Sequence, residues 1–169
     1  MRINVLGLGE SLSELPISTD IRIGVNDIDA RIKCDYVVCV DRPNLFNKER
    51  FTSIVNSECF KFYSQTDEWK PYFSNFEKIQ FSKGARGNLN DIDNTFPFSN
   101  NSTFVAVVLA YKLGATEISI FGADFNTHPN FKDAGLEIVL KDFKRLFDFL
   151  KSKGIKINVT KQSKINEII

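Results

Sequence analysis

The chain has 169 residues, of which 43% are apolar and 25% charged, and its formal net charge is +1. This length and composition are typical of one globular domain with its own core, so we predict a single domain over residues 1–169. The near-neutral charge excludes a global attraction to nucleic acid or to an anionic membrane, and we expect no specific nucleic-acid partner. No apolar run is long enough to predict a membrane span.

Short apolar runs rich in Val and Ile predict six strands, at 3–6, 21–25, 36–40, 59–63, 118–121 and 155–159. Helical spacing of apolar residues predicts a helix over 101–113, with Ser102 as a candidate cap and Gly114 as its stop. A second helix is predicted over 136–151, with Gly154 just beyond it. Strands that alternate with helices indicate an α/β fold with a Rossmann-like, mostly parallel sheet flanked by helices.

The stretch 65–98 fits this alternation worst. It contains two prolines and two glycines, and its aromatic residues are scattered among polar ones. Long structureless loops are uncommon inside compact domains, so we predict a functional insertion or lid with short helices of its own.

Ligands of such sheets bind beyond the carboxyl ends of the strands. Glycines or polar residues follow the predicted strands at 7–12, 26–27, 41–42, 64–66 and 122–128. This clustering at one edge of the sheet indicates a binding site there.

The glycine-rich turn at 7–12 suits a phosphate. Gly7 and Gly9 would let the backbone approach it closely, and Ser11 would cap the following helix or donate to the same phosphate. Position 12 is Leu, so the full G-x-G-x-x-G of dinucleotide sites is absent. The alternative is a tight strand-to-helix turn without a ligand.

Three polar residues at strand ends each have more than one interpretation. Asn26 would hold a base or ribose through its amide, or cap a helix that begins at Asp27. Asp41 would accept a ribose hydroxyl, bind a metal or pair with Arg42. Asp124 would do the same or form an Asx-turn, and the two aspartates together would suit one magnesium ion with phosphate oxygens.

His128 is the only histidine, and its ordinary pKa near neutrality makes it the candidate general acid or base. Its neighbours also suit an exposed turn without a catalytic role. Arg86, between Gly84 and Gly87, would clamp a phosphate from the insertion or be a solvated surface residue.

The cysteines, Cys34, Cys39 and Cys59, are odd in number and form no C-x-x-C pair, which predicts neither disulfides nor a zinc site. Residues 1–7 lack the long apolar segment of a signal peptide. Together these features predict a cytoplasmic protein.

Two motifs resemble a known superfamily. Segment 7–12, G-L-G-E-S-L, is similar to the G-x-G-P-S-L opening of bacterial, Campylobacter-type sialyltransferases and of the related 6-hydroxymethylpterin diphosphokinase-like proteins. Asn26 matches the Asn that ends their second strand. Segment 102–125 resembles their S-x-x-x-A-x-x-L-A-x-x-L-G-x-x-x-I-x-x-x-G-x-D-F motif. Leu8 and Glu10 depart from the sialyltransferases, which carry Asn and Pro there.

The resemblance implies a nucleotide held by a set of small and polar residues: Gly7, Gly9, Ser11, Asn26 and Ser102. Asp41 is more similar to the diphosphokinase branch, whose Asp is expected to handle magnesium and phosphate. His128 falls near the His that sialyltransferases use as base.

Three hypotheses follow. The favoured one is a glycosyltransferase-like enzyme that binds a nucleotide sugar, preferably a CMP-sugar, with Asp41 added to the nucleotide site, His128 and Asp124 as catalytic residues, and no metal or other cofactor. The second is a phosphotransferase that uses Mg2+ at Asp41 and Asp124. The third is a non-catalytic nucleotide-binding or structural protein. The acceptor is left open, as is the oligomeric state, a homo-oligomer included.

Overall fold

A computed structural model of the chain describes residues 1–125 and 133–169. The described residues form a seven-stranded sheet in the order β5-β4-β3-β2-β1-β6-β7, and all neighbouring strands are parallel. The strands are β1 (Arg2–Leu6), β2 (Ile21–Val25), β3 (Tyr36–Val38), β4 (Lys61–Ser64), β5 (Phe76–Lys78), β6 (Glu117–Phe121) and β7 (Lys156–Val159). This is the Rossmann-like α/β sheet that the sequence predicted.

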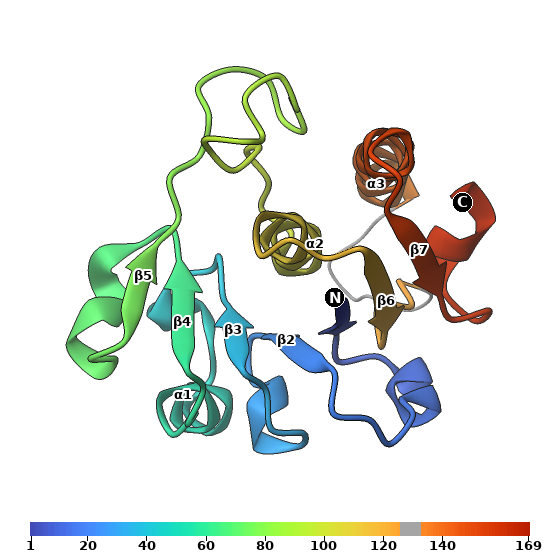
Figure 1. Cartoon of the computed structure of the whole chain (residues 1–169). Coiled ribbons are helices and arrows are strands. Elements are labelled where there is room, and N and C mark those ends of the chain that lie inside the picture. Colours follow the sequence, from blue (N-terminus) through green and yellow to red (C-terminus); the bar gives the residue numbers. More distant parts are fainter. Residues whose placement is uncertain (126–132) are drawn as a thin grey trace.

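Helices cover both faces of the sheet. The α-helices are α1 (Lys48–Val55), α2 (Ser102–Lys112) and α3 (Asp133–Ser152), and the 3₁₀ helices are η1 (Glu10–Glu14), η2 (Ile28–Ala30), η3 (Pro43–Leu45), η4 (Asp67–Tyr72) and η5 (Lys164–Ile168). In Figure 1, α2 and α3 lie on one face of the sheet and α1 lies on the other. Among the described residues, no helix combines the length and apolar character needed to cross a membrane.

Each face of the sheet has its own core. Every residue of α2 from Ser102 to Ala110 is buried, as expected for a helix that is apolar nearly all round, and α2 packs across β1, β2 and β3. The longer α3 is amphipathic and buries Phe143 and Phe147 against the same core. On the opposite face, fully buried Trp69 lies in a second cluster of apolar side chains.

The predicted strands and helices are present, with shifted ends. The strand predicted over 36–40 ends at Val38, because the Val40 backbone N–H leaves the sheet and donates to the Ser102 hydroxyl at 3.2 Å. The prediction of Ser102 as the cap of α2 is wrong: Asn101 is the cap, and its side chain accepts from the Phe104 N–H at 3.0 Å. Gly114, with a φ of +83°, follows the end of the helix as predicted.

One α-helix and one strand were missed. The helix α1 is short and polar, and Asn47 caps it by accepting from the Arg50 N–H at 2.9 Å. The strand β5 has three residues, two of them charged, at the edge of the sheet. Both β5 and η4 fall within 65–98, and they add a strand to the sheet and a buried Trp69 to its core. The predicted insertion is therefore limited to the later part of that stretch.

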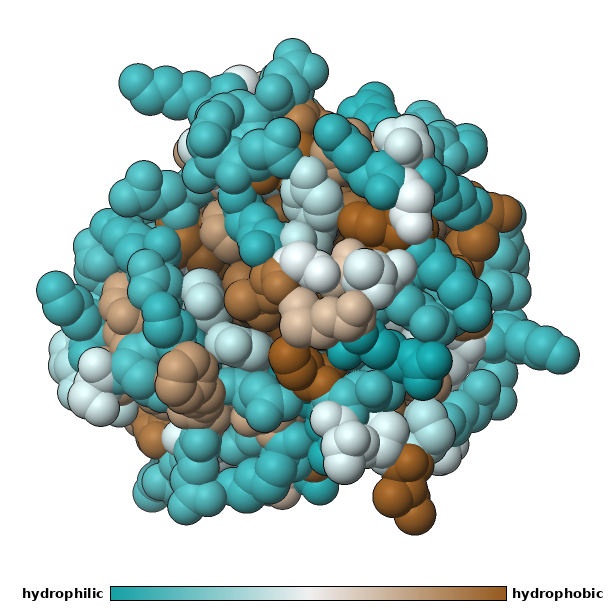
Figure 2. All heavy atoms as spheres, viewed as in Figure 1, coloured by the Kyte–Doolittle hydropathy of each residue, from teal (hydrophilic) through white to brown (hydrophobic). Residues whose placement is uncertain are grey.

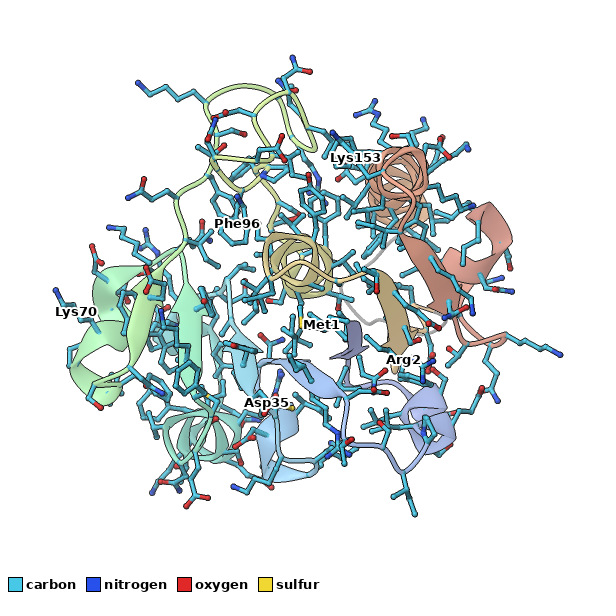
Figure 3. All side chains as sticks on the ribbon, in the orientation of Figure 1. Met1, Arg2, Asp35, Lys70, Phe96 and Lys153 are labelled. Atoms are coloured by element: carbon cyan, nitrogen blue, oxygen red, sulfur yellow. The ribbon has the colours of Figure 1, made fainter. Side chains whose placement is uncertain are left out.

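The loop 79–101 packs against α2. Asp93 accepts from the Tyr111 hydroxyl at 2.5 Å, and the Lys112 ammonium lies 5.2 Å from the ring centre of Phe96, labelled in Figure 3. Met1 and Arg2, also labelled in Figure 3, mark the edge at which the strands begin. The face seen in Figure 2 is largely hydrophilic, with apolar side chains gathered near its centre.

Candidate functional site

The order of the strands reverses at β1, because the chain adds β2 to β5 on one side of it and β6 and β7 on the other. In open parallel sheets the crevice at such a switch point, beyond the carboxyl ends of the strands, is the usual ligand site. The two segments that leave the sheet here are 7–12, after β1, and 122–125, after β6.

The glycine-rich turn is packed directly against the segment that follows β6. The Gly7 N–H donates to the Phe121 carbonyl at 2.8 Å, and the Gly9 N–H donates to the Gly122 carbonyl at 2.7 Å. A Cβ on Gly7 would lie 2.7 Å from the carbonyl carbon of Gly122, and one on Gly9 would lie 2.8 Å from the carboxyl carbon of Asp124. The absence of side chains at Gly7 and Gly9 therefore lets this turn pack closely against the segment that follows β6.

Ser11 is fully buried, and its hydrogen-bonding capacity is used within the protein. Its hydroxyl donates to Asp124 Oδ1 and accepts from the Gly122 N–H at 3.0 Å and from Thr160 Oγ1 at 2.9 Å. Its own N–H donates to Asp124 Oδ2 at 2.9 Å. A hydroxyl has one donor and two acceptor positions, so Ser11 has none left for a ligand.

Asp124 and its neighbours tie the end of the chain to this network. The Asp124 carbonyl accepts from the Lys164 N–H at 2.9 Å, and the Ala123 carbonyl accepts from Ser163 Oγ at 2.5 Å. Asp124 is also buried. The turn after β1, the end of β6 and η5 are thus held together by Ser11 and Asp124.

Removing the Ser11 hydroxyl should cost stability because it leaves three polar partners unsatisfied in a buried place. We expect Ser11→Ala to lower the free energy of unfolding by about 2 kcal/mol, measured by urea denaturation followed by circular dichroism. Ser13→Ala is the matched control, because the exposed Ser13 hydroxyl donates only to the Glu10 carbonyl of its own turn. Equal losses in the two variants would contradict a bracing role for Ser11.

A second group of polar residues lies beside the first, where β2 and β3 end and α2 begins. Asn26 has a φ of +53°, a left-handed conformation that Asn tolerates better than most residues. Its Oδ1 accepts from Ser102 Oγ at 3.3 Å, and Ser102 Oγ in turn accepts from the Val40 N–H at 3.2 Å. Asn26 does not cap η2, since Asp27 occupies the N-cap position.

The Asn26 amide turns its oxygen toward Ser102. The Ser102 hydroxyl donates to Asn26 Oδ1 and accepts from the Val40 N–H, so the nitrogen of the amide points away from Ser102. The Asn26 Nδ2 is left with two N–H donors that have no partner among the described residues. A pair of free amide donors at this edge can bind carbonyl, hydroxyl or phosphate oxygens.

Arg50 brings a positive charge close to this pair. It reaches Asp27 Oδ1 through Nη2 at 2.6 Å and through Nε at 3.0 Å, and its side chain remains 39% exposed. Burial raises the pKa of the Asp41 carboxyl above its ordinary value, and the Arg50 guanidinium offsets part of that increase. The expected partner of Asp41, Arg42, instead lies 3.6 Å from Glu68.

Asp41 and Asp124 do not come together. Asp41 follows β3 and Asp124 follows β6, and β2 and β1 lie between those strands. Three steps between neighbouring strands amount to about 14 Å, too far for one ion. The prediction that these carboxylates share a magnesium ion is wrong. No group of three or more metal-ligating residues occurs in the described part of the chain.

An open polar hollow of about 410 Å³ lies at the same edge of the sheet. It is lined by Arg42, Gln65, Thr66, Asp67, Glu68 and Lys78, which come from the carboxyl ends of β3, β4 and β5. Gln65 joins the hollow to the pair, because its Nε2 donates at 2.7 Å to the carbonyl of Val40. The hollow carries charges of both signs, which suits a hydroxylated, polar molecule.

Two other predicted residues have different outcomes. Arg86 is neither a free phosphate clamp nor a solvated surface residue, since it pairs with Asp142 at 2.6 Å. His128 lies outside the described residues. Arg50 was missed as a site residue, because it lies in the first turn of the unpredicted helix α1. Gln65 belongs to the polar segment 64–66 that the sequence placed at this edge, but it was given no role of its own.

Comparison with known proteins shows the fold. No family model and no curated protein matches the chain. Among solved structures, sialyltransferase CstII from Campylobacter jejuni in complex with the substrate analogue CMP-3FNeuAc is 17% identical, with a TM-score of 0.62 over 99% of this chain and 84% of that one. A mutant of α-2,3/8-sialyltransferase CstII is 21% identical, with a TM-score of 0.62 over 100% and 85%.

The monofunctional α-2,3-sialyltransferase Cst-I from Campylobacter jejuni is 15% identical, with a TM-score of 0.62 over 99% of this chain and 78% of that one. The resemblance to sialyltransferases is thus confirmed in three dimensions at low sequence identity. The chain has the α/β fold of the Campylobacter sialyltransferases along its whole length.

Proposed function

We propose that the protein is a glycosyltransferase-like enzyme that binds a nucleotide sugar, preferably a CMP-sugar, at the carboxyl edge of the sheet. The observation that carries the proposal is the Asn26–Ser102 pair, whose unpartnered amide donors lie where β2, β3 and α2 meet. The fold supports the choice of nucleotide, because solved structures of the similar CstII contain CMP or CMP-3FNeuAc.

The residues at this edge would divide into a binding group and a framework. Asn26 and Ser102 would hold the nucleotide, with Asp41 beside them as a hydroxyl acceptor and Arg50 as the nearby positive charge. We assign Gly7, Gly9, Ser11 and Asp124 to the framework, because their polar groups and close approaches are directed at one another. Asp124 would then support the site without touching substrate.

The reaction would transfer the sugar from the nucleotide to an acceptor hydroxyl. The hydroxyl oxygen would attack the anomeric carbon, the bond from that carbon to the phosphate oxygen would break, and the nucleotide would leave with both electrons. His128 is proposed as the base that takes the acceptor proton. Such a reaction depends on positioning and on proton removal and needs no metal ion.

The acceptor would lie in the polar hollow. Arg42 and Lys78 provide donors there, and Thr66 and Glu68 provide acceptors, a mixture that suits the hydroxyl groups of a saccharide. The hollow is open to solvent and adjoins the nucleotide site through Gln65, so an acceptor could enter beside a bound donor.

The binding of CMP tests the proposal. We expect isothermal titration calorimetry to show that CMP and CMP-sialic acid bind with the same affinity in magnesium and in EDTA, and that ATP and GTP bind at least about tenfold more weakly. Binding of ATP or GTP that requires magnesium would support the phosphotransferase instead. If none of the four ligands gives heat of binding or thermal stabilisation, both enzyme hypotheses are refuted, and a structural role or the binding of another ligand remains.

A further inference from the structure

Arg86 ties its own loop to α3 and to the end of that loop that leads into α2. From its place in the loop 79–101, its Nε donates to Asp142 Oδ2 on α3 at 2.6 Å, and its Nη1 donates to Asn100 Oδ1 at 2.6 Å. The Asp142 side chain is only 6% exposed, so this is a largely buried ion pair. Asn100 stands two residues before Ser102, the first residue of α2.

The backbone around Arg86 is shaped for this contact. Gly87 has a φ of +68°, and a Cβ at that position would lie 2.6 Å from Asp142 Oδ1. The Gly87 N–H donates to the Phe98 carbonyl at 3.0 Å, which ties the outgoing arm of the loop to the arm that returns to α2. The loop therefore meets α3 and the start of α2 at one point.

The segment that Arg86 reaches is the corner that places Ser102. Within it, the Asn101 N–H donates to Ser99 Oγ at 3.1 Å, and the Asn101 side chain caps the helix at Phe104. Ser99, Asn101 and Ser102 are buried, whereas Asn100 is exposed and reaches outward to Arg86. A shift of this corner would move Ser102 Oγ relative to Val40 and Asn26.

We propose that Arg86 is a positioning residue for the nucleotide site: it fixes the corner 99–102 against α3, so that Ser102 and Asn26 keep the geometry that binds the nucleotide. The inference rests on the proposed function for its ligand. The Arg86 guanidinium already has Asp142 as counter-charge, so its role is to hold the corner and not to bind phosphate. A purely structural ion pair would stabilise the fold without affecting the affinity of the folded protein.

The test separates affinity from stability. Arg86→Met keeps the length of the side chain but removes the guanidinium, and Asn100→Ala removes the arm to α2 while Asp142 stays paired. We expect each variant to raise the dissociation constant for CMP by about fivefold or more, and the double variant to be no weaker than Arg86→Met alone. Lys83→Met, at an exposed position of the same loop, should bind CMP like the unmodified protein.

Unpaired Asp142 would also lower the stability of Arg86→Met, so a second variant removes this effect. Arg86→Met combined with Asp142→Leu replaces the buried pair by apolar side chains and should recover thermal stability. The affinity of this variant for CMP should remain about fivefold weaker than that of the unmodified protein, because the corner 99–102 is still not held by Arg86. Recovery of the CMP affinity together with the melting temperature, or unchanged affinity in Asn100→Ala, would overturn the positioning role.

Amide exchange keeps the inference testable if the protein does not bind CMP at all. The Phe104 and Val105 N–H groups are held by Asn101 at 3.0 and 3.2 Å, and NMR should show faster exchange of both in Asn100→Ala. Faster exchange without CMP binding would refute the proposed ligand but retain Arg86 as the group that fixes the corner. Unchanged exchange would refute the role of Arg86 whatever the ligand.

Discussion

Gly7→Ala should lower the free energy of unfolding by about 4 kcal/mol, a large part of the stability of an ordinary domain. The added methyl would lie 2.7 Å from the Gly122 carbonyl carbon and 3.2 Å from the Ala123 nitrogen, both backbone atoms. Neither can move alone, because the Gly122 carbonyl is held by the Gly9 N–H and the Gly122 N–H by Ser11. Urea denaturation followed by circular dichroism measures the loss.

Gly114→Ala is the control, because it would introduce backbone strain without a steric clash. Gly114 has a φ of +83°, and a Cβ there would meet nothing within 4 Å. Its cost should therefore be near the 1–2 kcal/mol of a left-handed residue, about half that of Gly7→Ala or less. If Gly7→Ala lowers the free energy of unfolding no more than Gly114→Ala does, the turn does not pack against the segment after β6. A phosphate-binding role for the turn would then have to be considered again.

The glycine-rich turn illustrates how far a local motif can be interpreted. The sequence left two interpretations of this turn open, a phosphate site and a tight strand-to-helix turn without a ligand. What approaches Gly7 and Gly9 is the segment after β6, more than a hundred residues away in the sequence. A motif of six residues contains no information about such a distant partner. The sequence alone therefore could not distinguish a turn that binds a ligand from a turn that packs against another part of the chain.

The sheet was more predictable than the site. Buried parallel strands are continuous apolar runs, and the six predicted strands needed only this local signal. The short, charged β5 and the polar α1 lack it, and their positions depend on β4 and on the Asn47 cap. The convergence of polar residues at one edge also followed from strand order, because the carboxyl ends of parallel strands share an edge.

Which polar residues touch could not be predicted. Asn26 and Ser102 are 76 residues apart, and Ser11 and Asp124 are 113 apart. In the sequence, each of these four residues is a plausible ligand-binding group. In the structure, Ser11 and Asp124 bind each other, and the amide donors of Asn26 have no partner among the described residues. The assignment of binding and framework roles therefore depends on tertiary contacts.

Asn26→Asp should weaken CMP binding by at least about a hundredfold, which corresponds to about 2.7 kcal/mol. The substitution is isosteric, and one carboxylate oxygen can still accept from Ser102 Oγ as Oδ1 does now. The other oxygen replaces the Nδ2 donors with an acceptor that carries negative charge. It would therefore repel the phosphate and leave the ligand's own acceptor unpaired. Calorimetric titration with CMP measures the loss.

Two companion variants isolate the cause. Asn26→Gly accepts the φ of +53° and removes the amide without adding charge, so its affinity should fall by about tenfold, between the unmodified protein and Asn26→Asp. Asn56→Asp adds the same charge at the exposed end of α1 and should leave binding unchanged. If Asn26→Asp binds CMP as tightly as Asn56→Asp does, the amide donors do not face the nucleotide, and the Asn26–Ser102 pair no longer supports a nucleotide-sugar enzyme.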